Sequence, residues 1–248
     1  MRQFLLIFLL ILLSNSVFSQ EKSDRERIMT NEAFILNIAQ LNWLNAPKGM
    51  EIKPNSTEIG FYSMTPILGK RFNISLATGF GFVAQNVKSN VFPAFNPNGI
   101  TSLEKIPESI EYRNNKMTNV YVDIPFELRI RTTPNRKQKN FKIAAGVLVG
   151  YKLQSYHKYQ GEDYHTYSFG EYIKFKEYRI KNVSDLRYGI YGRIGYGKFS
   201  FFGFYSMSKV FQEQLGPSVT PYSIGISIIP VYSKSYYYSY YRKHILGE

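Results

Sequence analysis

Few residues of this chain have the types and spacing that catalysis needs. The histidines are His157, His165 and His244, and there is no cysteine. The stretch Glu162-Asp163-Tyr164-His165 could supply an acid–base pair in a loop, as a barrel protease or a lipid deacylase would use. A solvated loop with incidental charges accounts for the same residues more simply, and no Ser/His/Asp spacing stands out. We therefore predict no catalytic residue.

Metal and cofactor sites have equally little support. Three histidines without a cysteine are too few for a convincing zinc site. The glycines within 79–81 and 189–197 lack the strand–turn–helix context and the lysine of a phosphate-binding loop. Glycine on a strand more often allows curvature or close packing. The sequence therefore predicts neither a metal nor a cofactor.

The most specific constellation is a set of charged residues on the polar faces of alternating segments. The set contains six cations and two acids. Buried charges are tolerated only when they are paired, so we expect further partners: water, phosphate at the rims, or acids on strands whose facing the sequence leaves open. A structural salt-bridge network and a narrow solute path both remain open. The set is Asp123, Glu127, Arg129, Arg131, Lys142, Lys152, Arg187 and Arg193.

Strands must position these charges, because the dominant hydrophobic period is two. From 119 to 131, apolar residues at even positions alternate with mostly polar residues at odd positions, and successive strand side chains point to opposite faces. The facing of 57–68 is not fixed by its pattern. Gln154 is expected to face inward at the end of its strand. Eight strands are expected, at 33–44, 57–68, 72–83, 119–131, 141–154, 186–196, 199–209 and 222–228.

The connections favour a transmembrane barrel. The turns at 69–70 and 197–198 are tight, whereas 86–116 and 155–182 are expected to be loops of close to 30 residues. Long external loops that alternate with short turns are typical of outer-membrane barrels, and in lipid the sheet would close on itself. An eight-stranded interior is filled by side chains, which disfavours a solute path. The alternative is a soluble β-sandwich or lipocalin-like barrel with its apolar face inward.

Both ends of the chain are expected to lie outside the barrel. Residues 1–19 have the form of a secretory signal peptide, since the apolar run from Phe4 to Leu13 is shorter than the roughly 20 residues that a membrane span needs. A short leader (20–31) is expected before the barrel (32–231), and a Tyr-rich, basic periplasmic tail (232–248) after it.

The net charge of the chain is +13, or +12 without Arg2, which the signal peptide contains. For an exported chain this favours phosphate-rich lipid over nucleic acid as a partner.

Several stretches resemble the PorT-like outer-membrane β-barrel family of the Bacteroidetes. The resemblance covers about 34–229, and its motifs are strand patterns rather than catalytic signatures. It implies an outer-membrane barrel, and one branch of the family is tied to type IX secretion and gliding. The stretches are Asn42-Trp43-Leu44-Asn45, 121–129 (YVDIPFELR), 141–151 (FKIAAGVLVGY), Arg187-Tyr188-Gly189, 193–197 (RIGYG) and 222–228 (YSIGISI).

Together these features predict an exported, eight-stranded, antiparallel up-and-down barrel in the outer membrane. We expect a non-enzymatic structural or docking role, with outer-membrane lipid, lipopolysaccharide and secretion or envelope proteins as partners. The alternatives are a barrel enzyme acting on lipid or peptide and a narrow solute channel. The residues expected to touch lipid are Val122, Phe126, Val147, Ile190 and Ile226.

Overall fold

The computed structural model describes residues 32–68, 73–132, 139–164 and 171–230. Among them, no helix is long and apolar enough to cross a membrane. The expected signal peptide, leader and tail lie outside the described residues. The strands are β1 (Phe34–Leu44), β2 (Thr57–Leu68), β3 (Ile74–Lys88), β4 (Val91–Phe95), β5 (Thr101–Lys105), β6 (Tyr112–Arg131), β7 (Phe141–Glu162), β8 (Tyr172–Tyr178), β9 (Leu186–Tyr196), β10 (Phe199–Ser206) and β11 (Thr220–Ile228).

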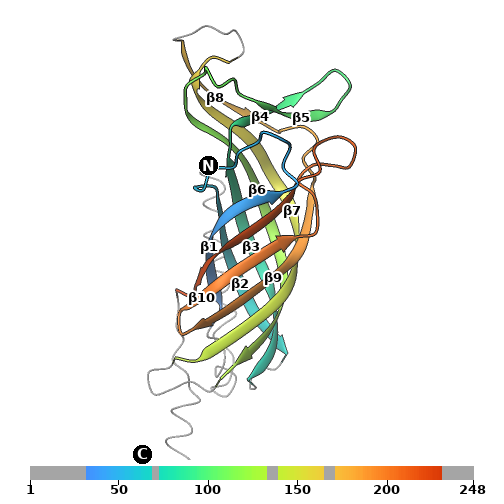
Figure 1. The fold of residues 1–248 in the computed structure, drawn as a ribbon. Coiled ribbons are helices and arrows are strands. Elements are labelled where there is room, and N and C mark those ends of the chain that lie inside the picture. The colour runs from blue at the N-terminus through green and yellow to red at the C-terminus, as the bar shows by residue number, and fades with distance from the viewer. Residues whose placement is uncertain (1–31, 69–72, 133–138, 165–170, 231–248) are drawn as a thin grey trace, which may run out of the picture.

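Eight of these strands close into an antiparallel barrel (Figure 1). The order around the ring is β1, β2, β3, β6, β7, β9, β10 and β11, and each strand is hydrogen-bonded to the next. β1 completes the ring with β11, where Ile38 lies opposite Ile226. Closure pairs both edges of every barrel strand, as a lipid environment requires. The expected eight-stranded barrel is confirmed.

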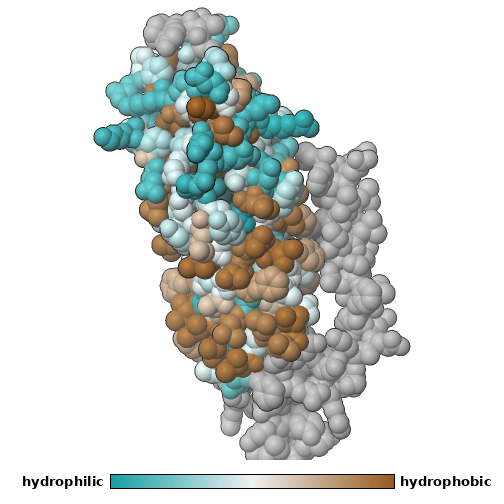
Figure 2. Space-filling view, turned by 90° about the vertical axis from the view of Figure 1, so that its right-hand side faces the viewer, coloured by the Kyte–Doolittle hydropathy of each residue, from teal (hydrophilic) through white to brown (hydrophobic). Residues whose placement is uncertain are grey.

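Side chains on the barrel strands alternate between an apolar outer face and a more polar interior. On β6, Ile124 and Phe126 are 51% and 46% exposed, whereas Asp123 and Glu127 are 0% exposed. Figure 2 shows the apolar surface gathered over one part of the molecule and the hydrophilic surface over the other. A soluble barrel would have the reverse arrangement, so that alternative is wrong. Exposed apolar residues on other barrel strands include Ile38, Ile59, Val147, Ile190, Phe201 and Ile226.

The height of the apolar face fits a membrane. On β6 it runs from Val120 to Ile130, which are 10 residues apart (130 − 120). That length of strand spans about 33 Å, or about 25 Å of depth at a tilt of about 40°. Outer-membrane barrels carry an apolar band of about this height. Thr118 and Lys116 follow on the same face and lie just beyond its edge.

The strands continue beyond this band at one end of the barrel. β3 runs to Lys88, β6 begins at Tyr112 and β7 runs to Glu162. β4 and β5 form a separate two-stranded sheet, and β8 pairs with β7 outside the ring. The prediction that 86–116 and 155–182 are loops is therefore wrong over most of their length. These strand segments were missed because their outward residues become polar where the strands leave the lipid.

We call this end the loop end, and the opposite end, where short connections join β2 to β3, β6 to β7 and β9 to β10, the turn end. At the turn end, Gly197 between β9 and β10 has a φ of 60°, which glycine adopts without strain. The turns at 69–70 and 133–138 lie outside the described residues. In outer-membrane barrels the short turns face the periplasm, so we expect the loop end to point outward from the cell.

A bulge in β7 reverses the facing of its second half. Adjacent residues of β6 pair with Lys152 and Gln154, so that Leu153 is an extra residue. Beyond it, Ser155 and His157 are buried, whereas Gln154 is exposed. The prediction that Gln154 faces inward is wrong, because one inserted residue shifts the alternation by one position.

Candidate functional site in the barrel interior

The first cluster of buried charges lies toward the turn end. Glu127 on β6 accepts hydrogen bonds from Arg193 on β9, with Nη2–Oε1 at 2.6 Å and Nε–Oε2 at 3.1 Å, and from Arg129 on its own strand. Glu32, just before β1, accepts a bond of 3.0 Å from Arg193 Nη2. Arg129 Nε and Lys142 Nζ each lie 3.6 Å from a Glu32 carboxylate oxygen. We call these five residues the turn-end cluster.

The second cluster lies nearer the loop end and centres on Arg187 of β9. Its Nε and Nη2 bind both carboxylate oxygens of Asp123 on β6, with Nε–Oδ1 at 3.0 Å. Its Nη1 lies 3.4 Å from Oε2 of Glu58 on β2. Such a two-pronged contact fixes the orientation of both groups. We call Arg187, Asp123 and Glu58 the mid-barrel cluster.

Uncharged side chains complete the mid-barrel cluster. The Arg187 guanidinium carbon lies 4.8 Å from the ring centre of Tyr121 and 5.0 Å from that of Phe204, which is within the range of cation–π attraction. The carboxylates also receive hydrogen bonds from uncharged donors, so they do not depend on the arginine alone. These donors are Tyr62 to Asp123, Gln85 to Glu58 and Ser223 to Glu58, at 3.0, 2.6 and 3.0 Å.

Small residues on β7 make these contacts possible. β7 lies between β6 and β9, and Gly150 is in register with Asp123 on one side and Arg187 on the other. A Cβ atom on Gly150 would lie 2.1 Å from Asp123 Oδ1. Ala144 occupies the equivalent place between Arg129 and Arg193. The β7 strand therefore leaves space through which side chains two strands apart reach each other.

The two clusters are neutral when taken together. The turn-end cluster has three cations and two carboxylates, and the mid-barrel cluster has one cation and two carboxylates, which gives four of each. All eight side chains are nearly or fully buried. Buried ions are tolerated when opposite charges and hydrogen bonds compensate them. This balance is what a structural filling of the barrel requires.

The structure places six of the eight residues singled out for the barrel interior in these clusters. Lys152 is one exception, since it lies at the loop end, donates to the Val183 carbonyl and pairs with Asp185 at 2.9 Å. Arg131 is the other, and at the turn end it donates to Ser75 Oγ at 2.7 Å. The six are Asp123, Glu127, Arg129, Lys142, Arg187 and Arg193.

Two acids of the clusters were not singled out from the sequence. Glu58 lies on β2, whose facing the hydrophobic pattern left open, and Glu32 precedes the first strand. One signal pointed to them indirectly. The excess of inward cations over inward acids predicted missing acids on strands of unknown facing, and Glu58 is such an acid.

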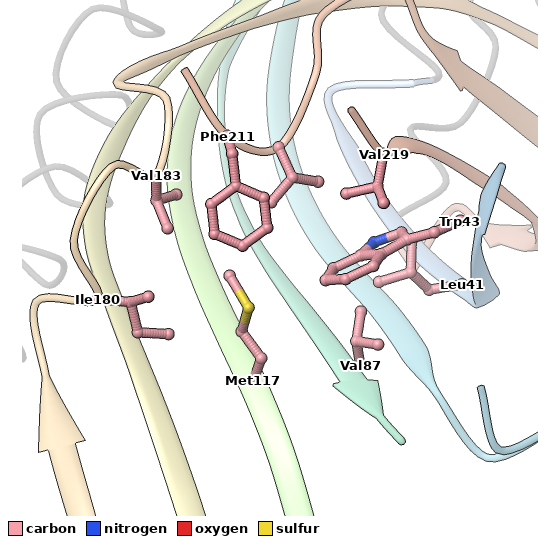
Figure 3. Packing of buried hydrophobic residues seen from close by; sticks show 9 residues of the cluster. Leu41, Trp43, Val87, Met117, Ile180, Val183, Phe211 and Val219 are labelled. Carbon is pink, nitrogen blue, oxygen red and sulfur yellow. The ribbon is translucent and has the colours of Figure 1, made fainter. Parts of the chain in front are cut away.

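An apolar cluster closes the interior at the loop end. In Figure 3, Phe211 points toward Met117 and Val183, while Trp43 lies beside Leu41 and Val219. Phe211 comes from the connection after β10, and its backbone bridges to Val183 in the connection before β9. These connections therefore fold over the barrel opening. The cluster consists of Leu41, Trp43, Val87, Met117, Ile180, Val183, Val210, Phe211 and Val219.

Little space remains between these layers. A cavity beside the turn-end cluster, lined by Ile35, Tyr62, Tyr191 and Phe202 among others, has a volume of about 10 Å³. That is about the space of one water molecule. This cavity is therefore too small to hold a solute.

The acid–base candidates make structural contacts where they are described. His157 is 1% exposed, its Nε2 lies 2.6 Å from Asn115 Oδ1, and its ring packs edge-on against Phe175. Glu162 accepts a hydrogen bond from the Glu111 backbone. Burial raises the pKa of nearby Tyr159 to about 12, and its hydroxyl donates to the Glu162 carbonyl. His165 and His244 lie outside the described residues.

No group of three or more His, Cys, Asp or Glu side chains that could hold a metal occurs among the residues that the structure describes. The carboxylates of the interior are engaged by arginine and lysine instead.

Comparison with known proteins places the barrel in a family. No curated protein and no solved structure matches the chain. A family model does match, over residues 36–211, which is more than half of the chain and spans the barrel from β1 to the connection after β10. That model describes a domain of the outer membrane, in agreement with the apolar outer face and the closed ring. The chain belongs to the family described as outer membrane protein beta-barrel domain.

Proposed function

We propose that the mature protein is a closed, non-enzymatic barrel that serves the outer membrane as a structural or docking component. The observation that carries this proposal is the filled interior. Two charge clusters cross the barrel, an apolar cluster covers the loop end, and the cavity beside the turn-end cluster has space for about one water molecule.

The narrow-channel alternative is weaker on physical grounds. A conducting path needs sites that an ion can enter and leave, lined by water or weak ligands. Here the interior carboxylates bind arginines from other strands, as Asp123 binds Arg187 and Glu127 binds Arg193. An ion that entered would have to break these pairs.

The one histidine among the described residues does not support the enzyme alternative. His157 is buried against Asn115 and Phe175, away from solvent. A catalytic base must reach the proton that it removes. The packing of His157 therefore supports a structural role for this histidine.

A more specific assignment to a branch of the family and to a cellular role rests on the resemblance to the PorT-like proteins and on the pattern of the sequence. We propose membership of the PorT-like branch and an accessory role in an envelope machinery such as type IX secretion. The extension of β3, β6, β7 and β8 beyond the membrane offers a folded surface for protein partners. We also propose cleavage after Ser19, and N-terminal sequencing of the mature protein tests it by reading Gln20 first.

Conductance in planar lipid bilayers tests the closed barrel. The purified protein, with its folding verified by heat-dependent migration on gels, is added to a bilayer beside a known porin as insertion control. We expect current at background level for this protein while the porin gives its usual steps. A steady, ion-selective current from the unmodified protein would overturn the proposal in favour of a channel.

A further inference from the structure

Four lysines stand side by side on four neighbouring strands at the loop end. Lys88 of β3 lies opposite Lys116 of β6, Lys116 opposite Lys158 of β7, and Lys158 opposite Lys176 of β8. Adjacent strands are about 4.8 Å apart, so the row extends over about 15 Å. We call these residues the lysine row.

The lysine row faces away from the packed side of the sheet. Its members are half-buried or exposed, whereas their chain neighbours Met117, His157 and Tyr159 are buried on the other side. All four amines therefore share one outward face.

Nothing in the described structure neutralises this row. None of its lysines forms an ion pair with a carboxylate of the described residues. Lys116 Nζ donates to Asn86 Oδ1 at 3.3 Å, and Lys176 Nζ lies over the rings of Tyr156 and Tyr178 at 3.7 and 4.5 Å. Like charges directly opposite each other destabilise a sheet, so the arrangement favours a bound anion.

The acids of β7 and β8 closest in sequence to the row lie away from it. Glu177 follows Lys176 but alternates to the other side, where it lies opposite His157. Glu162 shares the lysine face but is four residues beyond Lys158 on β7, farther from the membrane. The row therefore presents positive charge over its whole length.

The lysine row lies at a defined distance from the lipid-facing band. On β6, Lys116 is followed on the same face by Thr118 and then by Val120, where the lipid-facing band begins. Four residues of strand correspond to about 13 Å along the tilted strand, a distance that a lysine side chain shortens by extending toward the membrane. Tyr156 and Tyr178 lie opposite each other in the next row toward the membrane, and tyrosine is typical of the membrane interface.

From this placement we propose that the lysine row binds the phosphate groups of a phosphorylated lipid headgroup in the outer leaflet. Amines above, tyrosine rings at the interface and aliphatic side chains below match the order of phosphate, headgroup and acyl chains in such a lipid. A free phosphate ion would use the amines alone, so the depth of the row favours a lipid. This binding is independent of whether the barrel conducts.

Lipid binding by the full-length protein in a zwitterionic detergent tests the proposal, with complexes counted by native mass spectrometry. The probes are lipid A carrying its phosphates, dephosphorylated lipid A, and inorganic phosphate at matched phosphate concentration. The test variant is Lys116→Gln/Lys158→Gln. The control variant is Lys48→Gln/Lys181→Gln, which removes the same charge from two exposed lysines outside the row.

We expect phosphorylated lipid A to bind the unmodified protein and the control variant within about twofold of each other. The row variant should bind it about 25-fold more weakly, since each lysine near an anionic membrane surface contributes about fivefold. Heat-dependent migration on gels verifies that both variants fold. Equal loss in both variants, equal binding of dephosphorylated lipid A, or displacement of the lipid by inorganic phosphate alone would overturn the proposal.

Discussion

At the scale of single residues, Glu127 is the acid whose removal should cost most. It is fully buried and receives hydrogen bonds from Arg129 and Arg193. Glu127→Ala leaves these cations with Glu32 as their remaining carboxylate, so the free energy of unfolding should fall by about 3–5 kcal/mol. Urea-dependent unfolding in detergent measures the change. The exposed Glu213→Ala is the control, and an equal effect of both variants would contradict the buried network.

The variant Gly150→Ala tests whether β7 needs a small residue at the position where Asp123 and Arg187 contact each other across it. An added Cβ would lie 2.1 Å from Asp123 Oδ1, so Gly150→Ala forces the Asp123–Arg187 contact apart, and overpacking of this kind costs about 1–3 kcal/mol. Gly203→Ala on β10 is the matched control, because its Cβ would meet no atom within 4 Å. Unfolding midpoints should separate the two variants, and equal midpoints would refute the steric argument.

The sequence predicts only some of the residues that form the two interior charge clusters. Asp123, Glu127, Arg187 and Arg193 lie on strands with a regular alternation, so their facing follows from period two. Glu58 could not be assigned, because the residues of β2 on both faces include apolar and polar types. Which charges pair across the barrel depends on the register between strands, which no single strand encodes. The small residues of β7 are visible in the sequence, but the side chains that meet across them become known only with that register.

At the scale of elements, the outward face of the barrel can be tested at two depths. Phe126 of β6 lies within the lipid-facing band, and the exposed Gln154 of β7 lies opposite Val120 at the edge of that band. Arginine near the bilayer midplane costs about 2–4 kcal/mol and close to the interface about 0–1. Phe126→Arg should therefore reduce the yield of heat-modifiable folded barrel far more than Gln154→Arg. Equal yields would contradict the assigned membrane position.

The ends of the strands were predicted less well than their centres. In lipid, one face must be apolar, so β6 between Asn119 and Arg131 has an unambiguous pattern. Beyond the band the outward face contacts water, so its residues can be polar. Outward residues such as Lys116 and Lys158 therefore do not differ in polarity from many inward residues. The buried positions there include the polar Asn115 and His157 beside Met117 and Tyr159, so the hydrophobic alternation is interrupted on the inner face as well. The extension of β6 and β7 therefore had only a weak hydrophobic signal in the sequence.

At the scale of the whole molecule, the proposed closure of the barrel consists of two barriers in series. The apolar cluster at the loop end and the charge clusters within the barrel lie at different depths, and they involve different side chains. Flow through barriers in series is limited by the tighter one. Opening either barrier alone should therefore leave the barrel closed.

Phe211→Ala tests this arrangement. It removes the large side chain that packs at the centre of the apolar cluster, and truncation of a buried phenylalanine costs about 3–5 kcal/mol of unfolding free energy. The variant should unfold at a lower urea concentration and yet show no more current in planar bilayers than the unmodified protein, because Arg187 still spans from Asp123 to Glu58 below it. A stepwise current from Phe211→Ala alone would mean that the charge clusters do not seal the barrel, and that the loop-end cluster is the gate of a channel.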